Sequence, residues 1–450
     1  MRTTSFRPAR GASRAFRLGL VCLAAGVLPW LQPVAAQAAT TDTGKPTGIA
    51  CTTDGATTNP TFTLEAKPGY IQLPDGTTAY MWSYANGGAA FQHPGPVLCV
   101  NQNDTVTVIL TNSLPEPVSI MFPGQENVLA DGAPAQPQFS GVTATSLTNA
   151  VAPGASITYS FVASNPGSYI YESGTLPHKQ VRMGLFGALV VRPTQGASYM
   201  YNRTDSRYTT STQFSASGPQ VNEEYMVLLS ELDPYLHWAT EANYDFDFNY
   251  YHPRYWLING RGFPDSISDN FSTYLPDQPY GALARIHPKS ASHPYPGAIR
   301  YLNVGTEEFP YHPHGNNGRV IGRDGRPLAG PAGEDLSMEK FAINIGPGQA
   351  WDVLFDWYDA EGYASTPPSK NVPVTIPQVN NQEFGIFYSG SPYLGQTGPL
   401  PPGASTLNTC GEYYVISHNH ALFQMSSWGV NATGPITYVR IDPPLPNSCQ

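Results

Sequence analysis

Short runs in which apolar and polar residues alternate recur along most of the chain, and turns rich in Gly, Pro and Asn separate them. Successive side chains of a β-strand point to opposite faces of a sheet, so this alternation predicts half-buried strands. The clearest runs are residues 105–111, 156–162, 186–192, 225–230, 255–259, 297–303 and 350–355. Short strands at intervals of roughly ten residues predict an all-β fold of sandwich or barrel type.

Helical periodicity is weak throughout, and residues 334–340 are a candidate for a short helix. The Asp-Gly pair within residues 322–326 predicts a hairpin turn, because these residues favour positive backbone φ. Two stretches rich in Pro, Gly and Ser, residues 364–380 and 389–404, predict long loops.

A polar stretch at residues 194–221, rich in Ser, Thr, Gln and Gly, predicts a linker or surface crossing. A mature chain of about 410 residues is too long for one sandwich. We therefore expect a first domain over residues 45–195 and a second over residues 222–445. The irregular stretch at residues 233–280 predicts an insertion in the second domain or an approach to its sandwich.

The first 38 residues have the pattern of a secretory signal peptide. Five arginines precede an apolar region at residues 18–31. Ala36-Gln37-Ala38 then offers a small-residue cleavage site. The apolar region is too short to span a bilayer, and no later stretch approaches about twenty apolar residues. The sequence therefore predicts an exported protein, periplasmic or extracellular, with no membrane span.

The four cysteines outside this leader predict two disulfides, since an even number of cysteines in an exported chain is typical of paired thiols. Their grouping near the two ends favours Cys51–Cys99 and Cys410–Cys449, although three pairings are possible. No Cys-x-x-Cys pattern occurs, which argues against a structural zinc knuckle.

The charge balance is acidic. The formal net charge is −10 at pH 7, and removal of the leader with its five arginines lowers it to −15. Nucleic acids and anionic membranes attract clustered Lys and Arg, so both are disfavoured as partners.

Two histidine pairs, His312-Pro-His314 and His418-Asn-His420, hold four of the ten histidines in the chain. On an extended strand, a His-x-His pair places both imidazoles on one face. Two such strands side by side offer four nitrogen ligands, which suit copper, zinc, iron or nickel.

The chain resembles the multicopper oxidase family. The resemblance rests on four segments. Three of them resemble strands of the family, namely residues 95–108, 183–191 and 257–261, and residues 301–325 resemble its late copper-binding stretch. It implies tandem cupredoxin-like Greek-key β-sandwiches, bound copper, and oxidation of a small-molecule substrate that the sequence does not identify.

The ligands of the family's mononuclear blue copper site are replaced. In the family, a His-Pro-x-His-x-His stretch supplies one blue-site histidine, and Phe309 stands at that position here. The family's His-Cys-His stretch reads His418-Asn419-His420, and the second blue-site histidine is replaced by Gln424. A blue site needs its cysteine sulfur, so the resemblance predicts no such centre in this chain.

The family's trinuclear site is also depleted. Its first-domain histidine pairs fall on Met121-Phe-Pro123 and Glu172-Ser-Gly174, which leaves only the second-domain pairs. Four imidazoles cannot hold three coppers in any usual coordination, so we expect fewer ions than in a full multicopper oxidase. Glu172 stands where a ligand would be and is a candidate fifth ligand, although pairing with Lys179 or Arg182 is an alternative. His178 is a weaker candidate for the same region.

The candidate metal ligands are therefore His312, His314, His418, His420 and Glu172, in a reduced copper site between the two domains. The function expected is a copper-dependent oxidoreductase. A non-catalytic binding or assembly protein, whose histidines are remnants in a polar pocket, is the main alternative. A third possibility is a homo-oligomer in which another chain supplies missing ligands. The remaining histidines are interpreted as surface or packing residues, namely His93, His237, His252, His287 and His293.

Overall fold

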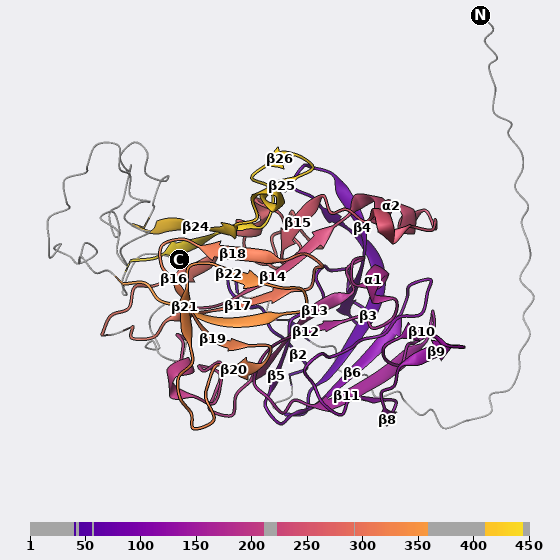
Figure 1. Ribbon diagram of the computed structural model, residues 1–450, viewed down its shortest axis with the longest axis horizontal. Helices are drawn as coiled ribbons and strands as arrows, with labels where there is room; N and C mark the ends of the chain where they lie inside the picture. Colours follow the sequence, from indigo (N-terminus) through magenta and orange to yellow (C-terminus); the bar gives the residue numbers. More distant parts are fainter. Residues whose placement is uncertain are drawn as a thin grey trace, which may run out of the picture. The chain divides into compact units, whose positions relative to one another are not determined.

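A computed structural model describes residues 40–41, 45–55, 58–210, 223–291, 293–358 and 410–443. Most regular structure in these residues is β-strand, arranged as sandwiches with few and short helices (Figure 1). The expected all-β fold of tandem sandwiches is thereby confirmed. The expected signal peptide and the two Pro-rich loops lie outside the described residues.

The first sandwich consists of two main sheets. One contains, in spatial order, β1 (Thr40–Thr41), β2 (Thr52–Thr53), β5 (Leu98–Asn101), β13 (Phe186–Arg192) and β12 (Gly167–Glu172). The other contains β4 (Thr78–Asn86), β3 (Thr61–Gln72), β6 (Thr105–Asn112), β11 (Ser156–Val162), β7 (Leu129–Ala130) and β8 (Ala133–Pro134). A small sheet of β9 (Gln138–Ser140) and β10 (Thr143–Ser146) and the short helix α1 (Pro177–Gln180) complete this half.

The second sandwich is built in the same way. One sheet contains β15 (Tyr255–Ile258), β14 (Glu224–Leu232), β17 (Gly297–Asn303), β23 (Ala350–Phe355), β19 (Gly318–Arg323) and β20 (Arg326–Pro327), with β21 (Met338–Lys340) also paired to β19. The other contains β16 (Ala284–Ile286), β27 (Ile436–Ile441), β24 (Tyr413–Asn419), β18 (Phe309–Pro313) and β22 (Ile343–Ile345). A hairpin of β25 (Ser426–Ser427) and β26 (Val430–Asn431) and the helix α2 (Pro234–Glu241) lie outside these sheets.

The two sandwiches repeat one strand arrangement. In the first, β3 runs parallel to β6, and β5 runs parallel to β13, which pairs antiparallel with β12. In the second, β14 runs parallel to β17, and β16 runs parallel to β27, which pairs antiparallel with β24. Strand β24 therefore has the same place in the second sandwich that β12 has in the first.

Burial along the strands follows the apolar pattern. In β6, Val106, Val108 and Leu110 are buried, while the threonines between them are more exposed, as a half-buried strand requires. Strands β13 and β14 are different, because almost all of their residues are buried. Both lie where the sandwiches meet, and Ala188 and Val190 of β13 share an apolar cluster with Leu228 of β14.

A buried network of charges crosses the same junction. Arg300 of β17 donates from Nε to Glu224 Oε1 at 2.7 Å and lies 3.3 Å from Asp352 Oδ1. Arg192 of β13 pairs with the same oxygen of Glu224 at 2.5 Å, which ties the first sandwich to the second. Burial raises the pKa of Glu224, but Arg192 and Arg300 outweigh it and lower that pKa to about 2. The carboxylate of Glu224 is therefore charged and depends on these arginines.

The local predictions met different outcomes. The Asp-Gly hairpin turn is confirmed, since it joins β19 to β20 with φ of 50° at Asp324 and 69° at Gly325. The candidate helix at residues 334–340 is wrong, because its end forms β21 and pairs with β19. Residues 233–280 combine α2, β15 and short 3₁₀ turns at Phe248–Tyr250 and Asp265–Ile267.

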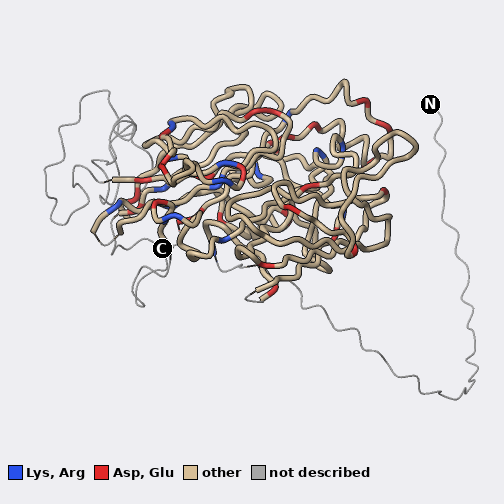
Figure 2. The backbone as a smooth tube through the Cα atoms, turned by 60° about the horizontal axis from the view of Figure 1, so that its bottom comes forward, with Lys and Arg blue, Asp and Glu red and all other residues tan. Residues whose placement is uncertain are grey.

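Charged residues are sparse on this framework. Figure 2 shows Lys and Arg interspersed with Asp and Glu along the described backbone, in keeping with the low charged content of 12%. Within the described residues, no helix reaches the length and apolar character needed to cross a bilayer.

The predicted Cys51–Cys99 disulfide is confirmed, with an S–S distance of 2.02 Å and a Cα–Cα distance of 5.5 Å. It links the segment before β2 to β5. Cys449 lies outside the described residues, so its pairing with Cys410 stays a prediction.

We expect a Cys51→Ser/Cys99→Ser variant to lose roughly 2–4 kcal/mol of unfolding free energy, because the bond closes a loop in the unfolded chain. The two cysteines are 48 residues apart. Denaturant unfolding of oxidised wild type, reduced wild type and the variant measures this effect. If reduction leaves the midpoint of wild type unchanged, this stabilisation is refuted.

Candidate metal centre

Two neighbouring strands carry the histidine pairs. Strands β18 and β24 lie side by side (Figure 1). His312 lies in β18 and His418 in β24, and the antiparallel pairing puts His312 directly opposite His418. The pairing continues past both strand ends, since the His314 N–H donates to Ile416 O at 3.0 Å and the His420 N–H donates to Pro310 O at 2.7 Å. Backbone register therefore brings all four imidazoles together.

The four rings form one cluster. Ring centroids of His312 lie 4.5 Å from His314, 5.6 Å from His418 and 5.5 Å from His420. Nε2 of His314 is 3.1 Å from Nε2 of His418. Two imidazole nitrogens bound at about 2.0–2.1 Å to one ion of tetrahedral geometry lie about 3.3–3.4 Å apart, so this pair needs to open by only a few tenths of an ångström to act as two ligands.

Backbone carbonyls orient two of the rings. Nδ1 of His312 is 2.5 Å from Phe341 O, and Nδ1 of His418 is 2.8 Å from Asn419 O. A carbonyl oxygen only accepts, so in each ring Nδ1 carries the hydrogen and Nε2 carries the lone pair of the neutral imidazole. Such an outer hydrogen bond is the usual support of a metal-ligating histidine.

The cluster is partly buried and open at one edge. His418 is buried, His312 and His314 are half-buried, and His420 is exposed. Burial, followed by the neighbouring imidazoles, lowers the pKa of His314 to about 4, and burial also lowers the pKa of His418. Neutral imidazoles with free lone pairs are the form that binds copper, so the donor set fits that metal.

The residues at the positions of the blue-site ligands pack against or hydrogen-bond to other protein groups. Phe309 packs in the apolar core of the second sandwich. Asn419 Nδ2 donates to Gln424 Oε1, and Gln424 Nε2 donates to Glu307 Oε2 at 2.8 Å. Trp256 Nε1 donates to the same oxygen of Glu307, also at 2.8 Å. These side chains bond to one another where the family has copper ligands.

The corresponding region of the first sandwich contains hydroxyl groups. Met121 and Glu172 form an isolated antiparallel bridge. The two segments that stand where the family has its first-domain histidine pairs therefore lie side by side. Next to them, Thr175 Oγ1 donates to Ser119 Oγ and lies within hydrogen-bond distance of Ser146 Oγ, both at 2.9 Å. Paired hydroxyls therefore lie beside the place of the missing histidines.

Glu172 belongs to the first sandwich, whereas the four histidines lie on paired strands of the second. It ends β12 in the first sandwich, and none of the interactions recorded among the described residues joins its carboxylate to the histidine cluster. Burial raises its pKa to about 7. The expected pairing with Lys179 or Arg182 is wrong, since Lys179 pairs with Glu116 and Arg182 lies 3.8 Å from the ring centroid of Tyr251.

Three of the other histidines lie outside both the four-histidine cluster and any group of metal-ligand type found among the described residues. His93 and His237 are buried, and burial is the main cause that lowers their pKa to about 3 and about 4. His252 is exposed. His178 packs edge-on against Phe248 at a centroid distance of 4.7 Å.

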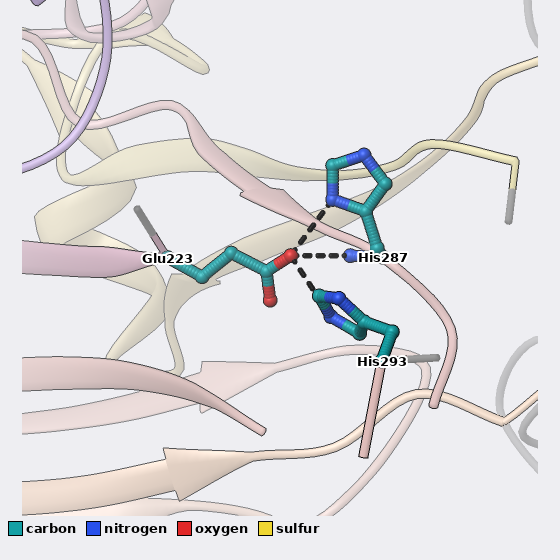
Figure 3. A group of neighbouring side chains, drawn as sticks. All are labelled: Glu223, His287 and His293. Atoms are coloured by element: carbon teal, nitrogen blue, oxygen red, sulfur yellow. Dashed lines mark hydrogen bonds and ion pairs between the residues drawn. The ribbon is translucent and has the colours of Figure 1, made fainter. Parts of the chain in front are cut away.

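Sequence reasoning missed a second group of possible ligands, made of Glu223, His287 and His293 (Figure 3). His287 and His293 were expected to be surface or packing residues, yet both lie beside the buried carboxylate of Glu223. His287 and His293 are six positions apart, which is not the spacing of two ligands on one face of a strand or helix. No neighbouring residue in the sequence marks Glu223 as a ligand. No pattern in the sequence was available to find this group.

Comparison with known proteins agrees with the fold. Residues 65–196 match the family model described as multicopper oxidase. An L-ascorbate oxidase of Cucurbita pepo var. melopepo is 39% identical over 106 residues, covering 23% of this chain and 18% of that protein. Laccase-1 of Emericella nidulans is 30% identical over 199 residues, covering 42% of this chain and 29% of that protein. The matched region thus spans less than a third of these relatives.

Solved structures extend the likeness to most of the chain. The multicopper oxidase mgLAC has a TM-score of 0.55 and 18% identity over 85% of this chain and 86% of its own. The blue copper oxidase from Nitrosomonas europaea has a TM-score of 0.53 and 18% identity over 85% of both chains. At such identity the structures show the fold alone. Residues 65–196 therefore resemble a multicopper oxidase domain, and the chain as a whole has the cupredoxin fold of these structures.

Proposed function

We propose that this protein is an exported copper protein in which a reduced site replaces the full copper set of the multicopper oxidases. His312, His314, His418 and His420 bind the copper, and the protein acts as a copper-dependent oxidoreductase on a small-molecule substrate. The observation that carries this proposal is the grouping of four imidazole rings on two paired strands, in which Nε2 of His314 and Nε2 of His418 lie 3.1 Å apart.

The residues around the cluster support a metal-binding role. Phe341 O and Asn419 O hold two rings with Nε2 available, so less ordering is needed when a metal binds. The exposed edge at His420 gives a substrate access to the site. Copper at this site would supply one-electron redox chemistry with dioxygen as the oxidant.

The route of electrons differs from that of the family. Phe309, Asn419 and Gln424 offer no thiolate or imidazole at the blue-site positions. We therefore infer that a substrate gives up its electrons at the four-histidine site itself. Export is supported by the leader pattern and by the Cys51–Cys99 disulfide, which suits an oxidising compartment.

The exposed edge of the cluster also favours a second candidate, a homo-oligomer in which a neighbouring copy completes the site. All four histidines belong to the second sandwich, and Glu172 of the same chain ends a strand of the first. A ligand such as Glu172 would then come from another copy. In that case copper binds to the oligomer and is lost from the isolated monomer, which size-exclusion chromatography with metal detection distinguishes.

Copper analysis of the purified mature protein tests the proposal. After reconstitution and removal of loose metal we expect about one copper ion per chain, no intense copper–thiolate charge-transfer band, and dioxygen consumption with a one-electron donor such as ascorbate. An intact mass lacking the first 38 residues confirms the processed form. A folded protein that retains no copper refutes the proposal and supports the non-catalytic binding protein, whereas an intense blue colour refutes the absence of a blue site.

A further inference from the structure

A second group of ligand-type side chains lies in the second sandwich, apart from the four-histidine cluster. Glu223 directly precedes β14, His287 directly follows β16, and His293 lies just before β17. Figure 3 shows both imidazoles directed at the carboxylate of Glu223. Their exposed fractions are 0% for Glu223, 5% for His287 and 1% for His293. Three segments thus bring one carboxylate and two imidazoles together away from water.

The ligand atoms lie close to the spacing that a metal requires. Oε1 of Glu223 is 2.7 Å from Nδ1 of His287 and 3.2 Å from Nε2 of His293. Oxygen and nitrogen ligands at about 2.0–2.2 Å from a tetrahedral ion lie about 3.2–3.6 Å from each other. The pair with His293 already has this spacing, and the pair with His287 has to open by roughly half an ångström when a metal replaces its hydrogen bond.

The second carboxylate oxygen supplies an independent indication. Glu223 Oε2 is buried and has no hydrogen-bond partner, although Oε1 receives both imidazoles and the His287 backbone N–H, at 3.0 Å. A buried charged oxygen without a partner is rare in native proteins, because its lost hydration is not replaced. A cation held between the imidazoles and this carboxylate supplies the missing partner.

An outer group also supports metal binding by His287. Its Nε2 is 3.7 Å from Asp442 Oδ2. Arg285 and Arg440 hold Asp442 in place, each with a contact of 2.6 Å. This distance is too long for a hydrogen bond, but a shift of less than about an ångström makes Asp442 the hydrogen-bonded carboxylate that zinc-ligating histidines usually have behind them.

We propose that Glu223, His287 and His293 bind a divalent transition-metal ion, best represented by Zn²⁺, at a closed structural site. Two imidazoles and a carboxylate suit Zn²⁺, and bidentate binding through Oε2 of Glu223 provides a fourth donor without solvent. The ion clips the start of β14 to the end of β16 and to the segment that enters β17. Because the three residues are buried, the role is structural and separate from copper chemistry at the four-histidine cluster.

Zinc retention by the full mature chain tests this site. The His418→Ala/His420→Ala variant serves as background, so that the four-histidine cluster does not contribute zinc. After metal removal, incubation with Zn²⁺ and gel filtration, we expect about one Zn²⁺ per chain in this background and a rise of several degrees in Tm over the metal-free form. Co²⁺ in place of Zn²⁺ is expected to give the visible absorption of a low-coordinate nitrogen and oxygen site.

Adding Glu223→Gln to the background is expected to remove the zinc, the Tm rise and the Co²⁺ absorption together. Glutamine keeps the size of the side chain but not its charge. A His293→Gln variant tests the same site if Glu223→Gln fails to fold, and near-ultraviolet circular dichroism establishes folding of each variant. Unchanged zinc retention in both variants, or no zinc in the folded background, overturns the proposal. Either variant in the otherwise wild-type chain should still bind copper at His418, so the two proposals fail separately.

Discussion

Replacing His418 and His420 together with alanine is expected to abolish copper binding at the four-histidine site and the dioxygen consumption that depends on it. The double change removes half of the imidazoles, including the nitrogen 3.1 Å from Nε2 of His314. Two imidazoles that remain on one strand leave most of the coordination positions of copper without protein ligands. We therefore expect less than a tenth of the wild-type copper content, which corresponds to a loss of more than about 1.4 kcal/mol in binding free energy when the metal is limiting.

Copper content is measured after reconstitution with limiting copper, together with dioxygen consumption and circular dichroism. The matched control is His252→Ala, since His252 is an exposed histidine of the same sandwich outside the cluster and its loss should leave copper content unchanged. Folded double-variant protein with full copper content would show that the metal binds elsewhere. Copper retention together with lost oxidase activity would instead assign His418 and His420 to the reaction only.

Replacing Arg300 with methionine is expected to destabilise the protein by about 3–5 kcal/mol, because a buried ion network loses its central cation. Arg300 is fully buried and bridges Glu224 and Asp352. Without it, Glu224 keeps only Arg192 as a cationic partner, and Asp352 keeps the hydroxyls of Ser168 and Tyr201. Typical domains have unfolding free energies of only about 5–15 kcal/mol, so this loss removes a large part of the total.

Denaturant unfolding of the two proteins measures this change. Arg203→Met is the matched control, because Arg203 pairs with Asp205 at a similar distance of 2.6 Å but on the surface, where an ion pair contributes about 0–1 kcal/mol. Arg300→Lys should lie between wild type and Arg300→Met, since lysine keeps the charge but cannot bridge two carboxylates with a planar fork. If Arg300→Met is as stable as Arg203→Met, the network does not stabilise the junction of the sandwiches.

The strands could be predicted from the sequence because their signal is local. All seven alternating runs coincide with strands, and residues 156–162, 186–192, 297–303 and 350–355 match β11, β13, β17 and β23 without a shift. Side-chain alternation depends only on the neighbouring residues and one buried face. The error at residues 334–340 has the opposite cause, since β21 exists through its pairing with β19, and such a partner leaves no trace in a short polar segment.

Glu172 shows how similarity along the sequence differs from proximity in space. Glu172 stands where the family has a histidine ligand, so the resemblance predicted that it lies near the histidine cluster. The repeated strand arrangement puts β12 in the first sandwich at the place that β24 has in the second. The ends of these two strands correspond to each other, so Glu172 lies in the first sandwich at the position equivalent to the end of β24, and its role as a fifth ligand stays a prediction.

The sequence by itself determined the strand pattern, the family resemblance, the even number of cysteines outside the leader and the identity of the histidine pairs, because these depend on local periodicity, spacing and residue type. Only the tertiary structure decided that His312 lies opposite His418, which follows from backbone register between strands about a hundred residues apart. It also decided that Glu223, His287 and His293 meet in the interior. Contacts of this kind depend on how distant segments pack, and no local pattern specifies that packing.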